Sequence, residues 1–170
     1  MSTKVMIIRF VLALIFVFGI IGAILFWMAD PLYLKAPPDS KLIRIFNNHR
    51  DAFESLRRMI IEDSQSYVSA SHLDERLSNK RRDEYRNLIS AIGAESIAPT
   101  SMSAVRFVFT GGGLSAIGPE WFKGIEYAPE DNDRGGIVIG SLDQPRDLVE
   151  GNIYLRQIGP HWYLFLQNTD

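Results

Sequence analysis

The stretch IYLRQIGPHWYLFL, residues 153–166, decides the fold of this 170-residue chain. It contains two runs of bulky residues, 153–158 and 162–166, with Gly159 and Pro160 between them as turn residues. Such aliphatic and aromatic runs suit a pleated, half-buried surface. The stretch therefore predicts a paired β-hairpin close to residue 170. One face of its last strand should pack beneath the helices, either Trp162, Leu164 and Leu166 or Tyr163 and Phe165.

Further strand candidates lie upstream of this hairpin. They are residues 104–109 (AVRFVF), 114–117, 123–128 (KGIEYA) and 136–139 (GIVI). The TGGG run at 110–113 predicts a tight reversal between the first two. Such close spacing leaves no room for crossover helices, so the sheet should be an antiparallel meander of about five or six strands.

Two amphipathic helices are expected before the strands. The first should begin with Asp39 or Ser40 as its cap and end near Glu62. Its apolar face is Leu42, Phe46, Phe53, Leu56 and Ile60, with His49 on the same stripe. The second should be capped by Ser78 and stopped by Gly93, with Tyr85, Leu88, Ile89 and Ile92 on one face. The sequence thus predicts an α+β fold, with helices covering one face of the sheet.

Residues 10–28 (FVLALIFVFGIIGAILFWM) contain no charged side chain. As a helix this run would span roughly 28 Å, close to the hydrocarbon thickness of a bilayer. A cleaved signal peptide is the alternative, but the best cleavage point, after Ala23, has bulky Ile21 three residues from the cut. We therefore expect residues 10–29 to be an uncleaved transmembrane signal anchor. Lys4 and Arg9 place the amino-terminal tail in the cytoplasm by the positive-inside rule.

These features divide the chain into four expected parts: a cytoplasmic tail at 1–9, the anchor at 10–29, a proline-containing linker at 30–39, and a periplasmic α+β domain at 40–170. Residues 30–170 carry 20 acidic and 16 basic side chains. This weakly acidic exterior argues against nucleic-acid binding. The absence of cysteine fits an oxidising compartment.

No catalytic, cofactor or metal site is expected from the sequence. The three histidines lack metal-ligand spacing, and the acidic run at 130–136 lacks the glutamate that ends a calcium loop. The glycines at 111–113 precede no G-K-[ST]. The acids of the strand region should be ordinary surface residues: Glu120, Glu126, Asp143 and Asp147.

Gly19 and Ala23 form a small-xxx-small pair within the expected span. Such a pair lets two transmembrane helices approach closely, so it offers a packing site for a partner helix or for a homodimer.

The chain also resembles a group of small uncharacterised membrane-anchored proteins of Gram-negative bacteria. The resemblance rests on residues 123–127 (KGIEY), 141–143 (SLD) and 161–164 (HWYL). It implies a bacterial protein held in the inner membrane and facing the periplasm, and it brings no activity with it.

Three functional hypotheses follow. The first is a single-pass, membrane-anchored periplasmic binding module that engages another protein, for example as an inhibitor or immunity-type protein. The second is a structural subunit of a bacterial envelope complex, in which the anchor is part of the interface. The third, least favoured, is an enzyme with an acidic site.

Overall fold

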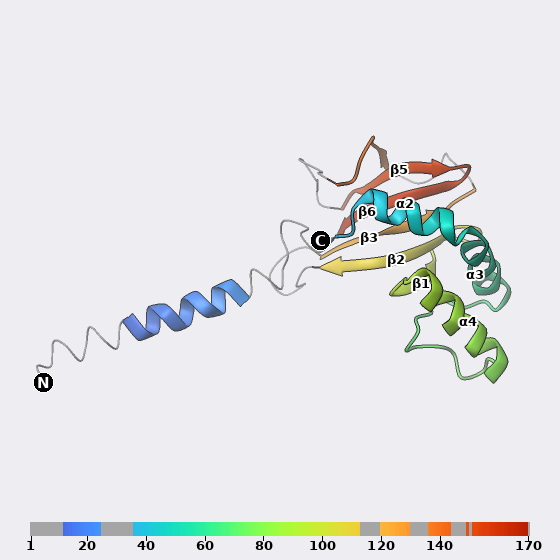
Figure 1. Cartoon of the computed structure of the whole chain (residues 1–170), viewed down its shortest axis with the longest axis horizontal. Coiled ribbons are helices and arrows are strands. Elements are labelled where there is room, and N and C mark those ends of the chain that lie inside the picture. Colours follow the sequence, from blue (N-terminus) through green and yellow to red (C-terminus); the bar gives the residue numbers. More distant parts are fainter. Residues whose placement is uncertain are drawn as a thin grey trace, which may run out of the picture.

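The structure is a computed structural model that describes residues 12–24, 36–112, 120–129, 136–143, 149 and 151–169. It confirms an α+β fold, with a helix at 12–24, three further helices and one six-stranded sheet (Figure 1). The helices are α2 (Asp39–Asn48), α3 (Arg50–Glu62) and α4 (Asn79–Ile92). The strands are β1 (Ser96–Pro99), β2 (Val105–Gly112), β3 (Glu120–Tyr127), β4 (Ile137–Val138), β5 (Ile153–Gly159) and β6 (Trp162–Thr169).

The sheet is not the simple antiparallel meander that the spacing predicts. Its order is β1-β2-β3-β6-β5-β4, so β6 lies between β3 and β5, and β4 pairs parallel with β5. Residues 162–166 are all buried. A strand that is apolar on both faces needs cover on both, which favours a central position. The short strands β1, missed from the sequence, and β4 occupy the two edges instead.

The glycine run does not turn where we expected. Thr110, Gly111 and Gly112 continue β2, with an irregularity in the register between Val108 and Thr110. The expected strand at 114–117 lies outside the described residues. A different glycine is constrained by close packing: a Cβ on Gly124 in β3 would lie 2.0 Å from the carbonyl oxygen of Phe107.

The first expected helix is two helices. The chain breaks at His49, which has φ −129° and is exposed rather than packed on the apolar stripe. Asn47, Asn48 and His49 are weak helix formers, so this is where the helix is easiest to break. Asp39 and Ser40 are not the cap, because α2 begins after Pro38 and has no side-chain cap bond.

The predicted apolar face of these helices is confirmed. Leu42, Phe46, Phe53, Leu56 and Ile60 are all buried. Phe46 in α2 and Phe53 in α3, on either side of the break at His49, both pack against Trp162 in β6. Their ring centroids lie 4.9 Å and 5.9 Å from that of Trp162. Trp162, Leu164 and Leu166 belong to this core with the helices, whereas Tyr163 and Phe165 belong to a second apolar cluster. The helices therefore cover one face of the sheet (Figure 1).

The second expected helix is α4. The Ser78 side chain accepts a hydrogen bond from the Arg81 amide, and Gly93 ends the helix with φ +72°. Asp63, just after α3, accepts hydrogen bonds from Arg81 Nε at 2.8 Å and from the Tyr85 hydroxyl at 2.9 Å. Because these bonds join the end of α3 to the first turns of α4, they fix the two helices against each other.

Helix 12–24 lies within the segment expected to be the anchor. Gly19 and Ala23 are both on it and both exposed, and a Cβ on Gly19 would meet nothing within 4 Å. Within the part of the chain that the structure describes, none of the helices has the length and apolar character of a membrane span. Residues 10–11 and 25–29 of the expected anchor lie outside the described residues.

The burial of Phe53 sets a test of the helix face. We expect Phe53→Ala to lower the free energy of unfolding by about 3–5 kcal/mol, because the truncated ring leaves a cavity between α3 and the sheet. Arg58→Ala on the exposed side of α3 should change it by less than about 0.5 kcal/mol. Urea denaturation of the full chain in detergent, followed by far-UV circular dichroism, measures both. Equal losses would contradict the assigned face.

Candidate functional site

The sheet face opposite the helices, here called the second face, carries the most distinctive chemistry of the described residues. Its apolar floor is built from Leu155 of β5 with Tyr163 and Phe165 of β6, all buried. Val108, Phe122 and Ile153 pack around them. None of the described helices contributes to this cluster.

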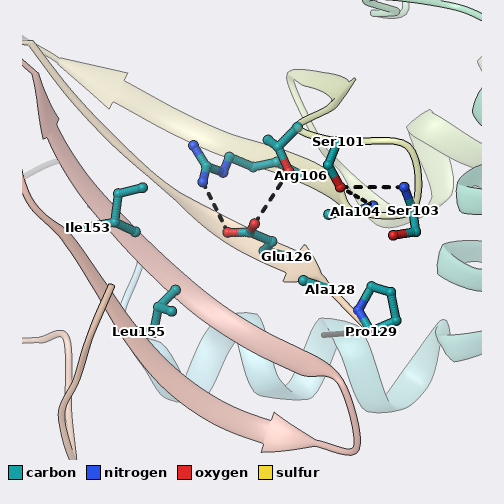
Figure 2. A pocket seen from close by; sticks show the side chains of 10 residues that line it. Ser101, Ser103, Ala104, Arg106, Glu126, Ala128, Pro129, Ile153 and Leu155 are labelled. Carbon is teal, nitrogen blue, oxygen red and sulfur yellow. Dashed lines mark hydrogen bonds and ion pairs between the residues drawn. The ribbon is translucent and has the colours of Figure 1, made fainter. Parts of the chain in front are cut away.

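A cavity of about 340 Å³ lies over the second face (Figure 2). One wall is the loop between β1 and β2, and the other is β5. Its lining residues are Thr100, Ser101, Ser103, Ala104, Arg106, Glu126, Ala128, Pro129, Ile153 and Leu155. Ligand pockets start at roughly 300 Å³. This cavity therefore suits one small group better than a large ligand.

An ion pair crosses the base of the cavity. Arg106 Nη2 in β2 lies 3.1 Å from Glu126 Oε2 in β3, and the two residues face each other in the register. Their side chains are only 16% and 6% exposed. The Arg106 guanidinium also lies 4.5 Å above the Phe165 ring and donates from Nη1 to Gln167 Oε1. These contacts hold Arg106 flat on the second face.

The loop at the cavity wall is ordered by its own hydrogen bonds. The Ser101 hydroxyl accepts from the amides of Ser103 and Ala104, at 3.4 Å and 3.1 Å. The Thr100 amide donates to the Ala104 carbonyl at 2.9 Å. Met102 at the loop tip is 97% exposed. The wall is therefore preformed, with an apolar side chain projecting from it into solvent.

A second group of charges lies on the helix side of the sheet. We call it the Asp39 cluster: Asp39, Lys123, Asp143 and Arg156. Asp39 and Lys123 are each 1% exposed, with Nζ 2.8 Å from Oδ1. The other oxygen of Asp39 accepts from Arg156 Nη1 and from the Leu142 amide, each at 2.8 Å.

Asp143 completes the Asp39 cluster from the other side. Its Oδ1 accepts from the Asp39 amide at 2.6 Å and lies 3.1 Å from Lys123 Nζ. Two carboxylates thus meet two cations, so the buried charge is balanced. Burial alone would raise the pKa of Asp39, but hydrogen bonds from Lys123, Leu142 and Arg156 together lower that pKa to about 2.

The structure corrects one expectation about the acidic residues. Glu126 is 5% exposed and paired with Arg106, so it is not an ordinary surface residue. Asp143 lies on the surface as expected, with its side chain 40% exposed, but it also bonds Lys123 and the start of α2. Asp147 and the side chain of Glu120 lie outside the description. The sequence did not predict the burial of Lys123 and Asp39. A lysine within a strand and an aspartate after two prolines are both ordinarily exposed.

Among the described residues, no group of three or more His, Asp or Glu side chains is placed to hold a metal ion. His161 lies in the β5–β6 turn as expected, exposed and with φ +64°.

The depressed pKa of Asp39 predicts acid sensitivity. The folded pKa is about 2, against 3.8 for an ordinary aspartate. The stabilisation is therefore complete above the unfolded value and is lost as the pH falls through the folded one, a loss of about 2 kcal/mol between pH 5 and pH 2. Urea denaturation at stepped pH measures it.

The control for this pH dependence is Asp39→Asn, which should lack that part of the acid loss. Asp74, whose pKa is also lowered to about 2 by hydrogen bonds from Arg76, titrates in the same window in both proteins and cancels in the difference. Parallel acid losses in the two proteins would contradict the assignment to Asp39.

In comparisons with known proteins, no protein-family model, no curated protein and no solved structure matches the chain.

Proposed function

We propose that the chain is a single-pass, membrane-anchored binding module whose domain at 40–170 faces the periplasm and engages another protein. The observation that carries the proposal is the cavity on the second face, with its preformed loop and buried ion pair. Charged side chains that are held by neighbours, beside apolar area, are typical of a surface built for recognition. An inhibitor or immunity-type protein is the class that this arrangement fits best.

The surroundings of the cavity support a protein as the partner. Met102 at the loop tip lies near Ile61, since both line a shallow hollow that shares Ser101 with the cavity. Ile61 is 36% exposed. Methionine is a common contact residue on adaptable binding surfaces. A partner that fills the cavity would therefore also meet apolar side chains across this loop.

The composition of helix 12–24 supports the tether at 10–29. Its largest side chains are widely exposed, including Ile15 at 63%, Phe16 at 69% and Phe18 at 67%. Apolar area of this kind is stable when lipid or another apolar helix surrounds it. With Lys4 and Arg9 on the cytoplasmic side, the sequence from residue 30 onward would lie in the periplasm.

The alternative is a structural subunit of an envelope complex. Gly19 favours it, because the space beside its Cα is open to an approaching helix. Replacing residues 10–29 with an unrelated anchor separates the two proposals. A binding module keeps its function after the exchange, whereas a subunit that packs through Gly19 and Ala23 loses it.

An enzyme is the proposal with least support. Among the described residues that line the cavity, Glu126 is the one carboxylate, and it is already ion-paired with Arg106.

The orientation of the chain can be tested by thiol labelling, because the protein has no cysteine. Ala70 is exposed in the loop before α4. We expect Ala70→Cys to react with a membrane-impermeant maleimide in intact spheroplasts. Labelling that requires lysis would place the domain in the cytoplasm.

The binding surface can be tested by site-specific photo-crosslinking in cells. We expect benzoylphenylalanine at Met102 or Ser103 to form a discrete adduct with a second protein, because Ser103 lines the cavity and Met102 is the exposed tip of the same loop. The matched controls are Arg44 and Arg58, exposed on α2 and α3. Adducts that form equally at all four positions, or only at the helices, would refute the proposed surface.

A further inference from the structure

We propose that the cavity on the second face receives an uncharged aromatic side chain with a polar tip, a tyrosine or a tryptophan, from the partner protein. This inference rests on the proposed binding function and names the group that is recognised. Three properties of the cavity lead to it: its charge balance, an acceptor with room for a donor, and the character of its walls.

The charge balance of the cavity excludes a charged ligand group. Arg106 and Glu126 neutralise each other at 3.1 Å and are largely removed from solvent. A further cation or anion at this depth would be desolvated without a counter-charge of its own among the described lining residues. Each Nη of Arg106 donates one hydrogen bond, to Glu126 or to Gln167, and its buried Nε has no partner among the described residues. The incoming group is therefore neutral.

Glu126 retains an acceptor for that group. Its Oε2 accepts from Arg106, whereas Oε1 contacts only the Thr100 hydroxyl among the described residues, at 3.5 Å. Hydroxyl bonds to oxygen are ordinarily about 2.5–3.0 Å long, and an ionised carboxylate offers roughly four lone-pair positions. Oε1 can thus take a stronger donor from a ligand. Figure 2 shows Glu126 between the loop and β5, at the base of the cavity.

The apolar walls of the cavity favour an incoming side chain whose main part is an apolar ring. Ala128 and Pro129 line one end, and Ile153 and Leu155 line the side formed by β5. These side chains give an apolar contact for a ring, and the volume of about 340 Å³ is large enough to hold one. Tyrosine and tryptophan combine an apolar ring with one donor, and both are enriched among the residues that dominate protein interfaces.

Methyl NMR of the full chain in detergent micelles tests the proposal with four probes: the N-acetyl amides of tyrosine, tryptophan, phenylalanine and arginine. The methyl groups of Ala104, Ala128, Ile153 and Leu155 report on the cavity. Those of Leu56, Ile97 and Leu164, buried on the helix face, are the controls. We expect shifts confined to the cavity methyls with the tyrosine or tryptophan probe. The phenylalanine probe should bind at least about fivefold more weakly, because it lacks the donor for Glu126.

A matched pair of variants tests the acceptor. Glu126→Gln should bring the tyrosine and phenylalanine affinities closer together, whereas Thr100→Val, which removes the competing hydroxyl, should leave their ratio unchanged or larger. Tighter binding of the arginine probe, equal affinities for tyrosine and phenylalanine, or no cavity shifts with any probe would each overturn the inference. The crosslinking result is separate: adducts at Met102 and Ser103 without probe binding would refute only the recognised group, and absent adducts would refute the binding function.

Discussion

The buried ion pair between Asp39 and Lys123 is the contact on which the arrangement of this protein depends. Asp39 is the first residue of α2, and Lys123 lies in β3 near the middle of the sheet. Arg156 of β5 and the Leu142 amide bond the same carboxylate. Three distant parts of the chain therefore meet where the helices begin. A charge that is buried with its partner tolerates little displacement, because separating the two leaves each desolvated and unpaired. The ion pair thus fixes the side of the sheet on which α2 lies.

With α2 on one side, the two faces of the sheet contribute to different apolar clusters. The helices and Trp162 form the main core, while Tyr163 and Phe165 on the same strand form the floor of the second face. Because β6 is buried on both sides, its side chains contribute both to the main core and to the floor of the second face. The Arg106–Glu126 pair is balanced and held by Phe165 and Gln167, so these two side chains add no net charge at the base of the cavity. This charge balance supports the proposal that the cavity recognises an uncharged group.

Sequence patterns predicted the features that depend on local periodicity. The α+β class, the apolar faces of the helices, the Ser78 and Gly93 ends of α4 and the terminal hairpin are all confirmed. The features that depend on distant partners were not predictable. Insertion of β6 between β3 and β5, the parallel pairing of β4 and the break at His49 follow from tertiary packing. Asp39, Lys123 and Glu126 are charged residues whose burial becomes stable only when a partner from another element arrives. Residues 123–127 and 141–143 are two of the short motifs on which the resemblance rests. In the fold they are joined by the ion pair between Lys123 and Asp143.

A double-mutant cycle between Asp39 and Lys123 tests this account most directly. Asp39→Asn and Lys123→Met should each lower the free energy of unfolding by about 1.5–3 kcal/mol, since each leaves a buried charge with one partner fewer: Lys123 keeps Asp143, and Asp39 keeps Arg156. The double variant should lose much less than both together, with a coupling energy of at least about 2 kcal/mol. The surface Asp74–Arg76 pair, with an N to O distance of 2.6 Å, provides the comparison and should couple far more weakly. Additive losses at Asp39 and Lys123 would contradict the claim that this ion pair holds the helices on the sheet.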